Sequence, residues 1–160
     1  MNVFMARQFL HRKSKISLSV AMVLTSAVVA ACGSSKDGTT NEAQFPVQVT
    51  EERVATGSVL YADNCASCHG EPGVSPPVLP TAPPHDENGH TWHHADRLLF
   101  EWILDRPPMA TVMPAFRGQL TEEETISILS YIKSTWSDDI QEFQSERSAQ
   151  YELQLKQNAK

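Results

Sequence analysis

Two cysteines and a histidine in the stretch "CASCH", Cys65 to His69, could together hold a metal or a prosthetic group. The C-x-x-C-H spacing is typical of covalent haem attachment, in which each thiol adds across a vinyl group and the histidine ligates the iron. A zinc site would need a second pair of ligands, and the one other cysteine, Cys32, lies far upstream. A thioredoxin-type dithiol would follow a strand and open a βαβ unit, and no such pattern surrounds Cys65. The residues therefore favour one haem c, bound covalently through Cys65 and Cys68, with His69 as an axial ligand.

Met113, in the stretch "VMPAF", is the residue that we expect to ligate the iron from the opposite face. A residue before proline is restricted to extended geometry, so Pro114 directs the backbone at this point. A thioether ligand opposite a histidine raises the reduction potential of a haem iron, which suits an electron carrier. Met109 is a nearby competitor for the same place, and Met113 could instead fill a gap in the core.

Four further histidines lie close together in "HDENGHTWHH": His85, His90, His93 and His94. Histidines at this density can bind copper or zinc. One of them could also ligate the iron and give a low-potential haem with two histidine ligands. We favour a third interpretation, a hydrogen-bonded loop that packs Trp92 beside the haem and leaves most of the imidazoles in solvent.

The first 31 residues have the composition of a secretory signal peptide. An uncharged, mostly apolar run from Ile16 to Ala31 follows a basic start, and it is shorter than a membrane-spanning helix needs. The basic residues are Arg7, Arg12, Lys13 and Lys15. The end of the run, "VVAAC", resembles the lipobox of bacterial lipoproteins, which predicts that Cys32 becomes the lipidated first residue of the mature chain. The alternative is an ordinary cleaved signal with an incidental cysteine.

Lipidation at Cys32 would anchor the chain in a bacterial membrane, facing the periplasm or the extracytoplasmic side. The stretch "GSSKDGTTNEAQ" that follows is rich in small polar residues, so we expect residues 32–49 to form a flexible tether. Removal of the signal peptide would take the formal net charge from −6 to −10. An acidic surface of this kind argues against nucleic acid as a partner.

Helical periodicity dominates the remainder of the chain, and no stretch shows the alternation of a β-strand. Thr50 can cap a first helix that leads into Cys65. A middle helix is expected from Ala95 to Asp105, and Thr121 with Glu124 forms a capping box for a third. These patterns predict an all-α fold. The expected parts are a signal peptide (1–31), a tether (32–49), an all-α domain with three main helices (50–136) and a polar helical tail (137–160).

The order of helix, "CASCH", proline-rich loop, middle helix, "MPAF" and capped last helix resembles a class I c-type cytochrome over residues 50–136. The resemblance implies that the first and last helices cross closely, with Gly57, Tyr61 and Tyr131 at the crossing. The stretch from Ala82 to His94 departs from the family, because its shortest members lack these histidines.

The same resemblance implies that a proline carbonyl accepts a hydrogen bond from the free N–H of the iron-bound histidine, which orients the imidazole. Pro77, in "PPVL", best matches the family's proline, and Pro80 is the second choice.

The function that the resemblance implies is one-electron transfer by a membrane-tethered monohaem cytochrome c. Its partners would be redox proteins, such as a membrane electron donor and a terminal oxidase or reductase, and no residue need act as acid, base or nucleophile. Two alternatives stay open. One is a haem sensor or catalyst with an open sixth site, and the other is a copper-handling lipoprotein that uses the His85–His94 loop.

Overall fold

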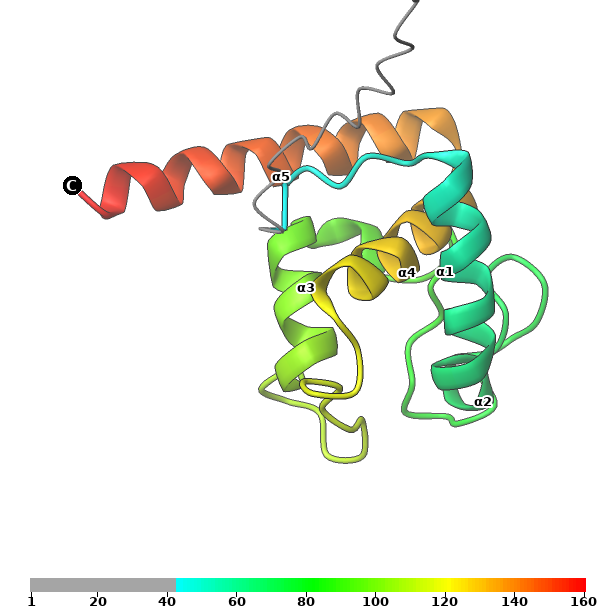
Figure 1. Cartoon of the computed structure of the whole chain (residues 1–160). Helices are drawn as coiled ribbons and strands as arrows, with labels where there is room; N and C mark the ends of the chain where they lie inside the picture. Colours follow the sequence, from blue (N-terminus) through cyan, green and yellow to red (C-terminus); the bar gives the residue numbers. More distant parts are fainter. Residues whose placement is uncertain (1–42) are drawn as a thin grey trace, which may run out of the picture. The chain divides into compact units, whose positions relative to one another are not determined.

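The computed structural model describes residues 43–160, and within that range it contains helices and loops but no strand. The expected all-α fold is therefore confirmed for this part of the chain (Figure 1). The elements are α1 (Glu51–Asn64), α2 (Ala66–His69), the 3-10 helix η1 (Thr91–His93), α3 (Asp96–Asp105), α4 (Glu122–Ser134) and α5 (Asp138–Asn158). Among the described helices, none has the length and apolarity that a membrane crossing needs.

The helix starts follow the capping residues that the sequence predicts. The Thr50 side chain accepts a hydrogen bond from the backbone N–H of Arg53 at the start of α1. At the start of α4, Thr121 and Glu124 form the complete capping box, in which each side chain accepts from the other residue's backbone N–H. Such caps satisfy backbone groups that the helix itself leaves unpaired.

Helices α1 and α4 pack directly against each other at Gly57, as the family resemblance implies. A Cβ atom at Gly57 would lie 1.9 Å from the carbonyl oxygen of Ser127 and 2.9 Å from the Cβ of Tyr131. The rings of Tyr61 and Tyr131 meet beside this point, with their centroids 5.5 Å apart. The crossing fixes the end of α1, and therefore the start of "CASCH", against α4.

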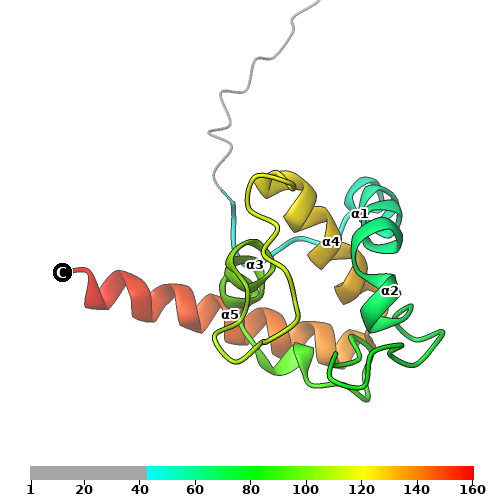
Figure 2. The ribbon, with the colours of Figure 1, turned by 90° about the horizontal axis from the view of Figure 1, so that it is seen from below.

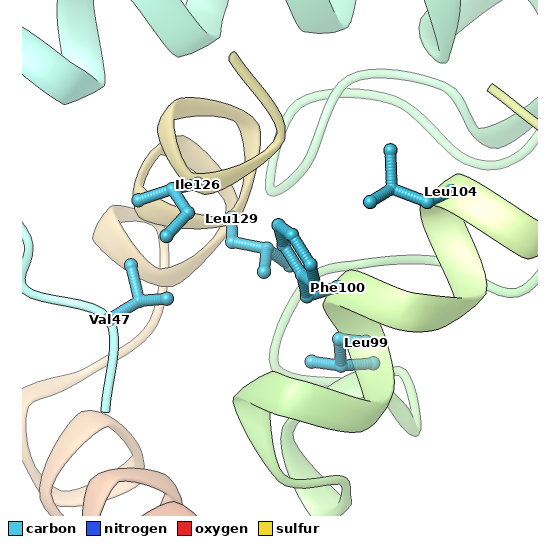
Figure 3. Packing of buried hydrophobic residues seen from close by; sticks show 6 residues of the cluster. All are labelled: Val47, Leu99, Phe100, Leu104, Ile126 and Leu129. Atoms are coloured by element: carbon cyan, nitrogen blue, oxygen red, sulfur yellow. The ribbon is translucent and has the colours of Figure 1, made fainter. Parts of the chain in front are cut away.

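A hydrophobic cluster joins α3 and α4 to the segment before α1 (Figure 3). Its buried members are Val47, Leu99, Phe100, Leu104, Ile126 and Leu129. Phe45 packs edge-on against Phe100, at 5.4 Å between ring centroids. The expectation that a flexible tether extends to residue 49 is therefore wrong for the segment around Val47, because Val47 is buried in the cluster and Ala43 and Phe45 pack against it.

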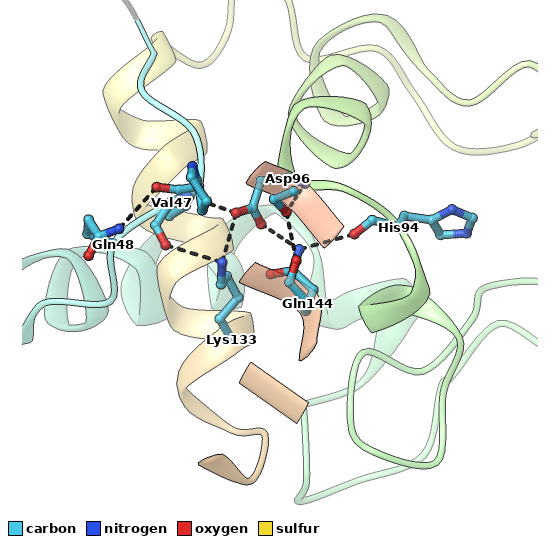
Figure 4. A network of polar contacts seen from close by, with 8 residues as sticks. Val47, Gln48, His94, Asp96, Lys133 and Gln144 are labelled. Atoms are coloured by element: carbon cyan, nitrogen blue, oxygen red, sulfur yellow. Dashed lines mark hydrogen bonds and ion pairs between the residues drawn. The ribbon is translucent and has the colours of Figure 1, made fainter. Parts of the chain in front are cut away.

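A buried polar network holds the same segment to three helices (Figure 4). The carboxylate of Asp96 in α3 accepts hydrogen bonds from Val47 N at 2.7 Å, Lys133 Nζ at 2.8 Å and Gln144 Nε2 at 2.7 Å. Lys133 lies on α4 and Gln144 on α5. Burial lowers the pKa of Lys133, and the neighbouring Asp96 partly offsets that effect. An ion pair that is shielded from water loses the hydration of both charges, and the three hydrogen bonds to Asp96 compensate for this loss.

The expected polar tail forms a 21-residue helix, α5. It packs on α3 and η1, and its C-terminal end runs past α3 (Figures 1 and 2). Arg97 and Glu152 join α3 to α5 through two charge-assisted hydrogen bonds of 2.7 Å. The tail is therefore anchored to the domain over most of its length.

Candidate functional site

The "CASCH" residues lie where α1 ends and the short helix α2 begins. Cys65 N donates to the Tyr61 carbonyl, which closes α1, and His69 N donates to the Cys65 carbonyl within the next turn. Cys65 and Cys68 are both free, partly exposed thiols. Burial raises the pKa of Cys65 to about 12, with smaller contributions from Cys68 and Glu71, so this thiol is protonated at neutral pH.

Cys65, Cys68 and His69 line a cavity of about 490 Å³. The volume lies within the range of cofactor pockets, on the order of 300–1,000 Å³. Its walls are mainly apolar and come from α3, α4 and the loop after α3. The apolar residues among them include Leu99, Ile103, Phe116, Ile128, Leu129 and Ile132.

The loop after α3 brings both candidate methionines to the cavity. Met113 is partly buried and packs against the cluster that contains Tyr61, Phe116 and Ile128. Met109 is 91% exposed. Met113 is thus the better-placed thioether, and its ligation of the iron stays a prediction.

The imidazole of His69 is oriented by the carbonyl of Pro83, at 2.8 Å from Nδ1. A carbonyl can only accept, so Nδ1 carries the proton and the lone pair of Nε2 is free for a metal. This corrects the expectation that Pro77, or Pro80, would supply the carbonyl.

The reason lies in the path of the proline-rich loop. The backbone N–H groups of Val78 and Leu79 both donate to the Cys68 carbonyl at 3.0 Å, so the chain after Pro77 is tied to the end of α2. Gly70, at φ +68°, lets the carbonyl of Pro76 pass where a Cβ would lie only 2.3 Å away. The loop therefore reaches the His69 ring only at Pro83.

His85 lies flat against His69, with ring centroids 4.2 Å apart and an angle of 22° between the planes. Its Nδ1 lies 2.7 Å from Thr91 Oγ1, and its carbonyl accepts a 2.7 Å hydrogen bond from the Trp136 indole. Burial, and then the proximity of His69, lower the pKa of His85 to about 3, which keeps the ring neutral. The sequence indicated a histidine-rich loop but gave no sign that His85 would contact His69.

The other three loop histidines form a cluster beside the cavity. His90 is 4.7 Å from His93 and 5.0 Å from His94, measured between ring centroids. His90 and His94 line the cavity, whereas His93 stacks on Trp92. Across residues 43–160, no three histidine, cysteine or acidic side chains are grouped so that they could hold a metal ion. The described structure therefore gives the copper-handling alternative no support.

Two tyrosine hydroxyls complete the contacts around "CASCH". The buried Tyr61 donates to the Gly70 carbonyl at 2.9 Å, and Tyr131 donates to the Glu71 carboxylate at 3.1 Å. Burial raises the pKa of both phenols, so they remain neutral donors. Both bonds hold the segment just after His69 against the crossing of α1 and α4.

These residues fit a covalently attached haem. Two thiols and an imidazole with a free Nε2 share a large, mainly apolar cavity with a thioether, and these are the ligand types of a cytochrome c. Cys32, the expected lipidation site, lies outside the described residues.

Comparison with known proteins supports the same assignment. The sequence pattern of the family described as Cytochrome c matches residues 54–136. The chain is 34% identical over 93 residues to a 1-butanol dehydrogenase (cytochrome c) of Thauera butanivorans, and 28% identical over 95 residues to a quinohemoprotein alcohol dehydrogenase of Comamonas testosteroni. Each alignment covers 56% of this chain but 12% of the relative.

No solved structure matches the chain significantly. The family match runs from the first turn of α1 to just beyond the end of α4, and it includes Cys65, Cys68, His69 and the loop with Met113. Such a domain is an electron-carrier module. Together with the all-helical fold around the cavity, the match shows that the chain belongs to the cytochrome c family, whose prosthetic group is covalently bound haem c.

Proposed function

We propose that this chain is a membrane-tethered monohaem cytochrome c that transfers single electrons between respiratory redox proteins. The observation that carries the proposal is the cavity shared by Cys65, Cys68, His69 and Met113. When bound, the haem supplies the redox chemistry, since its iron takes up and releases one electron. The protein's part is to attach the group, orient its ligands and exclude water.

Each residue of the site has a definite task in this proposal. Cys65 and Cys68 hold the haem by thioether bonds, and His69 is oriented by Pro83 so that Nε2 can ligate the iron. Met113 would supply a thioether to the iron, which would raise the reduction potential relative to a second histidine. None of these tasks requires a general acid, a general base or a nucleophile, so we propose an electron carrier rather than an enzyme.

Replacement of Met113 by alanine tests the proposal most directly. We expect the Met113→Ala holoprotein to lose the absorption band of the methionine–iron bond, to bind carbon monoxide when reduced, and to have a lower reduction potential. The matched control is Met109→Ala, which removes an exposed methionine of the same loop and should change none of these properties.

Other outcomes would favour the alternatives. If the unaltered holoprotein already binds carbon monoxide readily, its sixth site is open, and a haem sensor or catalyst becomes the better assignment. If the Met113 variant keeps the native spectrum while Met109→Ala changes it, the ligand is Met109.

The relatives favour a dehydrogenase as the electron donor. Both are alcohol dehydrogenases, and one is named for its cytochrome c and the other as a quinohemoprotein. This chain spans only 12% of the length of each relative. We propose that its haem domain accepts electrons from a dehydrogenase or another membrane donor. A terminal oxidase or reductase would then receive them.

The proposed cellular location of the protein rests on the sequence of residues 1–32. We propose that Cys32 carries the lipid anchor and that the haem domain faces the periplasm or the extracytoplasmic side of a bacterial membrane. The signal-like residues 1–31 support this placement.

A further inference from the structure

His85 is held in one orientation by contacts on several sides. Its Nδ1 is 2.7 Å from the hydroxyl oxygen of the buried Thr91, and its carbonyl accepts from the Trp136 indole. The edge of its ring meets Tyr61, at 6.1 Å between centroids and 80° between planes. The face of the His85 ring lies against the face of the His69 ring, with 4.2 Å between centroids and 22° between planes.

The Thr91 hydroxyl links the His85 ring to the backbone of the same loop. Its oxygen lies 2.7 Å from His85 Nδ1 and 3.4 Å from the Pro84 carbonyl oxygen, so the ring edge is held in place.

His85 adds a second contact to the His69 ring, beside the hydrogen bond to Pro83. That hydrogen bond limits rotation of the ring about the Cβ–Cγ bond, but an N–H···O bond tolerates bending by about 30°, so the ring can still pivot within that range. A flat neighbour at van der Waals distance blocks such pivoting, since any rotation would push the edge of one ring into the face of the other.

We propose that His85 is a positioning residue that sets the plane of the His69 imidazole in the haem protein. The inference rests on the proposed ligation of iron by His69. Groups around a metal-bound histidine orient it and tune the metal, so the plane of the ring bears on the electronic structure of the haem.

In this proposal, the stretch from Ala82 to His94 serves to hold His85 against His69. This is the stretch in which the chain departs from the shortest family members. It is braced from the C-terminal side by hydrogen bonds from the Trp136 indole to His85 O and from Gln144 Nε2 to His94 O. Trp92 adds an indole bond to Glu87 O and an edge contact with Phe143 of α5. Helix α5 and this stretch together hold the ring that faces His69.

The test compares His85→Leu with His85→Phe in the full-length holoprotein. Proton NMR of the oxidised protein reports the plane of an axial imidazole through the spread and order of the haem methyl resonances. We expect the leucine variant to change that order and to shift the reduction potential, with the methionine–iron absorption band retained. Phenylalanine keeps a flat ring at the position, so it should restore the wild-type order.

The matched control is His93→Leu, which removes a loop histidine that does not line the cavity and should leave the methyl resonances unchanged. An unchanged order of methyl resonances in His85→Leu would overturn the proposal. Loss of an iron ligand in that variant would overturn it too, because His85 would then itself be the ligand.

A further variant keeps the proposal testable if His85→Leu does not fold. Thr91→Val removes the hydrogen bond that orients the His85 ring and should alter the methyl resonances in the same sense, and an unaltered order would count against the proposal. A failure of the proposed iron ligand is distinguishable. In that case His69→Ala would leave the wild-type haem spectrum intact, whatever the His85 variants do.

Discussion

Gly57 shows how one missing side chain positions the "CASCH" residues at the end of α1. Alanine has the higher helix propensity by about 1 kcal/mol, so a free helix would gain from Gly57→Ala. In the folded protein the new Cβ would meet the backbone of Ser127 at 1.9 Å, and a backbone atom cannot rotate away. We expect a net loss of about 2 kcal/mol or more in the free energy of unfolding, because overpacking here exceeds the gain in propensity.

Urea denaturation of the holoprotein would measure this loss. Thr56→Ala, one residue earlier on the exposed side of α1, is the control, and it should be neutral or slightly stabilising. A stable Gly57→Ala protein with wild-type behaviour would show that α1 and α4 are not held at this crossing.

The residues of the site differ in how far the sequence could predict them. One local motif predicts Cys65, Cys68 and His69, because the C-x-x-C-H spacing is itself the signature of haem attachment. The carbonyl partner of His69 could not be chosen correctly, since several prolines precede His85 and only the path of the loop decides which one reaches the ring. The stacking of His85 on His69 depends on Thr91 and Trp136 together, which no local pattern connects.

At the scale of elements, the helices with strong local signals were predicted well. The caps at Thr50 and Thr121 and the prolines after α3 are local features, and the observed boundaries follow them. The short helix η1 has no apolar periodicity of its own. The tether is inferred from the polar stretch "GSSKDGTTNEAQ" and is extended to residue 49, although the residues that follow it, "FPVQV", are mostly apolar. Helix η1 and the segment around Val47 are both ordered by contacts with distant parts of the chain, namely Trp92 with Phe143 and Val47 with Asp96.

The Asp96–Lys133 pair is the element-scale feature that ties the segment before α1 to α3, α4 and α5. Both side chains are almost fully buried, at 0% and 1% exposed. Lys133→Met would leave the Asp96 carboxylate buried without its counter-charge, although Val47 N and Gln144 would still donate to it. We expect a loss of about 3–5 kcal/mol in the free energy of unfolding.

The exposed pair of Arg53 and Glu123 provides the control for this measurement. Their guanidinium and carboxylate also meet at 2.9 Å, but the side chains are 28% and 65% exposed. Arg53→Met should cost less than about 1 kcal/mol, because water screens and solvates both charges. Equal, small losses in the two variants would show that the Asp96–Lys133 pair does not hold these elements together.

At the scale of the whole molecule, the ordered residues 43–49 shorten the chain available as a tether. With Cys32 as the proposed anchor, residues 33–42 separate the lipid from the packed part of the domain. If these ten residues behave as a coil, their root-mean-square reach is on the order of 16–19 Å. A tethered domain meets membrane partners at a high effective concentration, which depends on the length of this linker.

Shortening residues 33–42 to a few residues would show whether the length of the tether or the charge of the domain controls how the protein meets its redox partner. We expect electron transfer to the membrane partner to fall sharply, because the domain could no longer reach donor and acceptor in turn. The solution kinetics of a Cys32→Ser protein, which lacks the lipid, should stay unchanged.

The competing explanation is steering by the acidic surface, whose formal net charge is −6 and would be −10 without residues 1–31. Steering weakens as salt rises, since the Debye length is only about 8–10 Å near physiological ionic strength. If the shortened linker has no effect and added salt abolishes transfer, charge governs the encounter and the tether sets only the location.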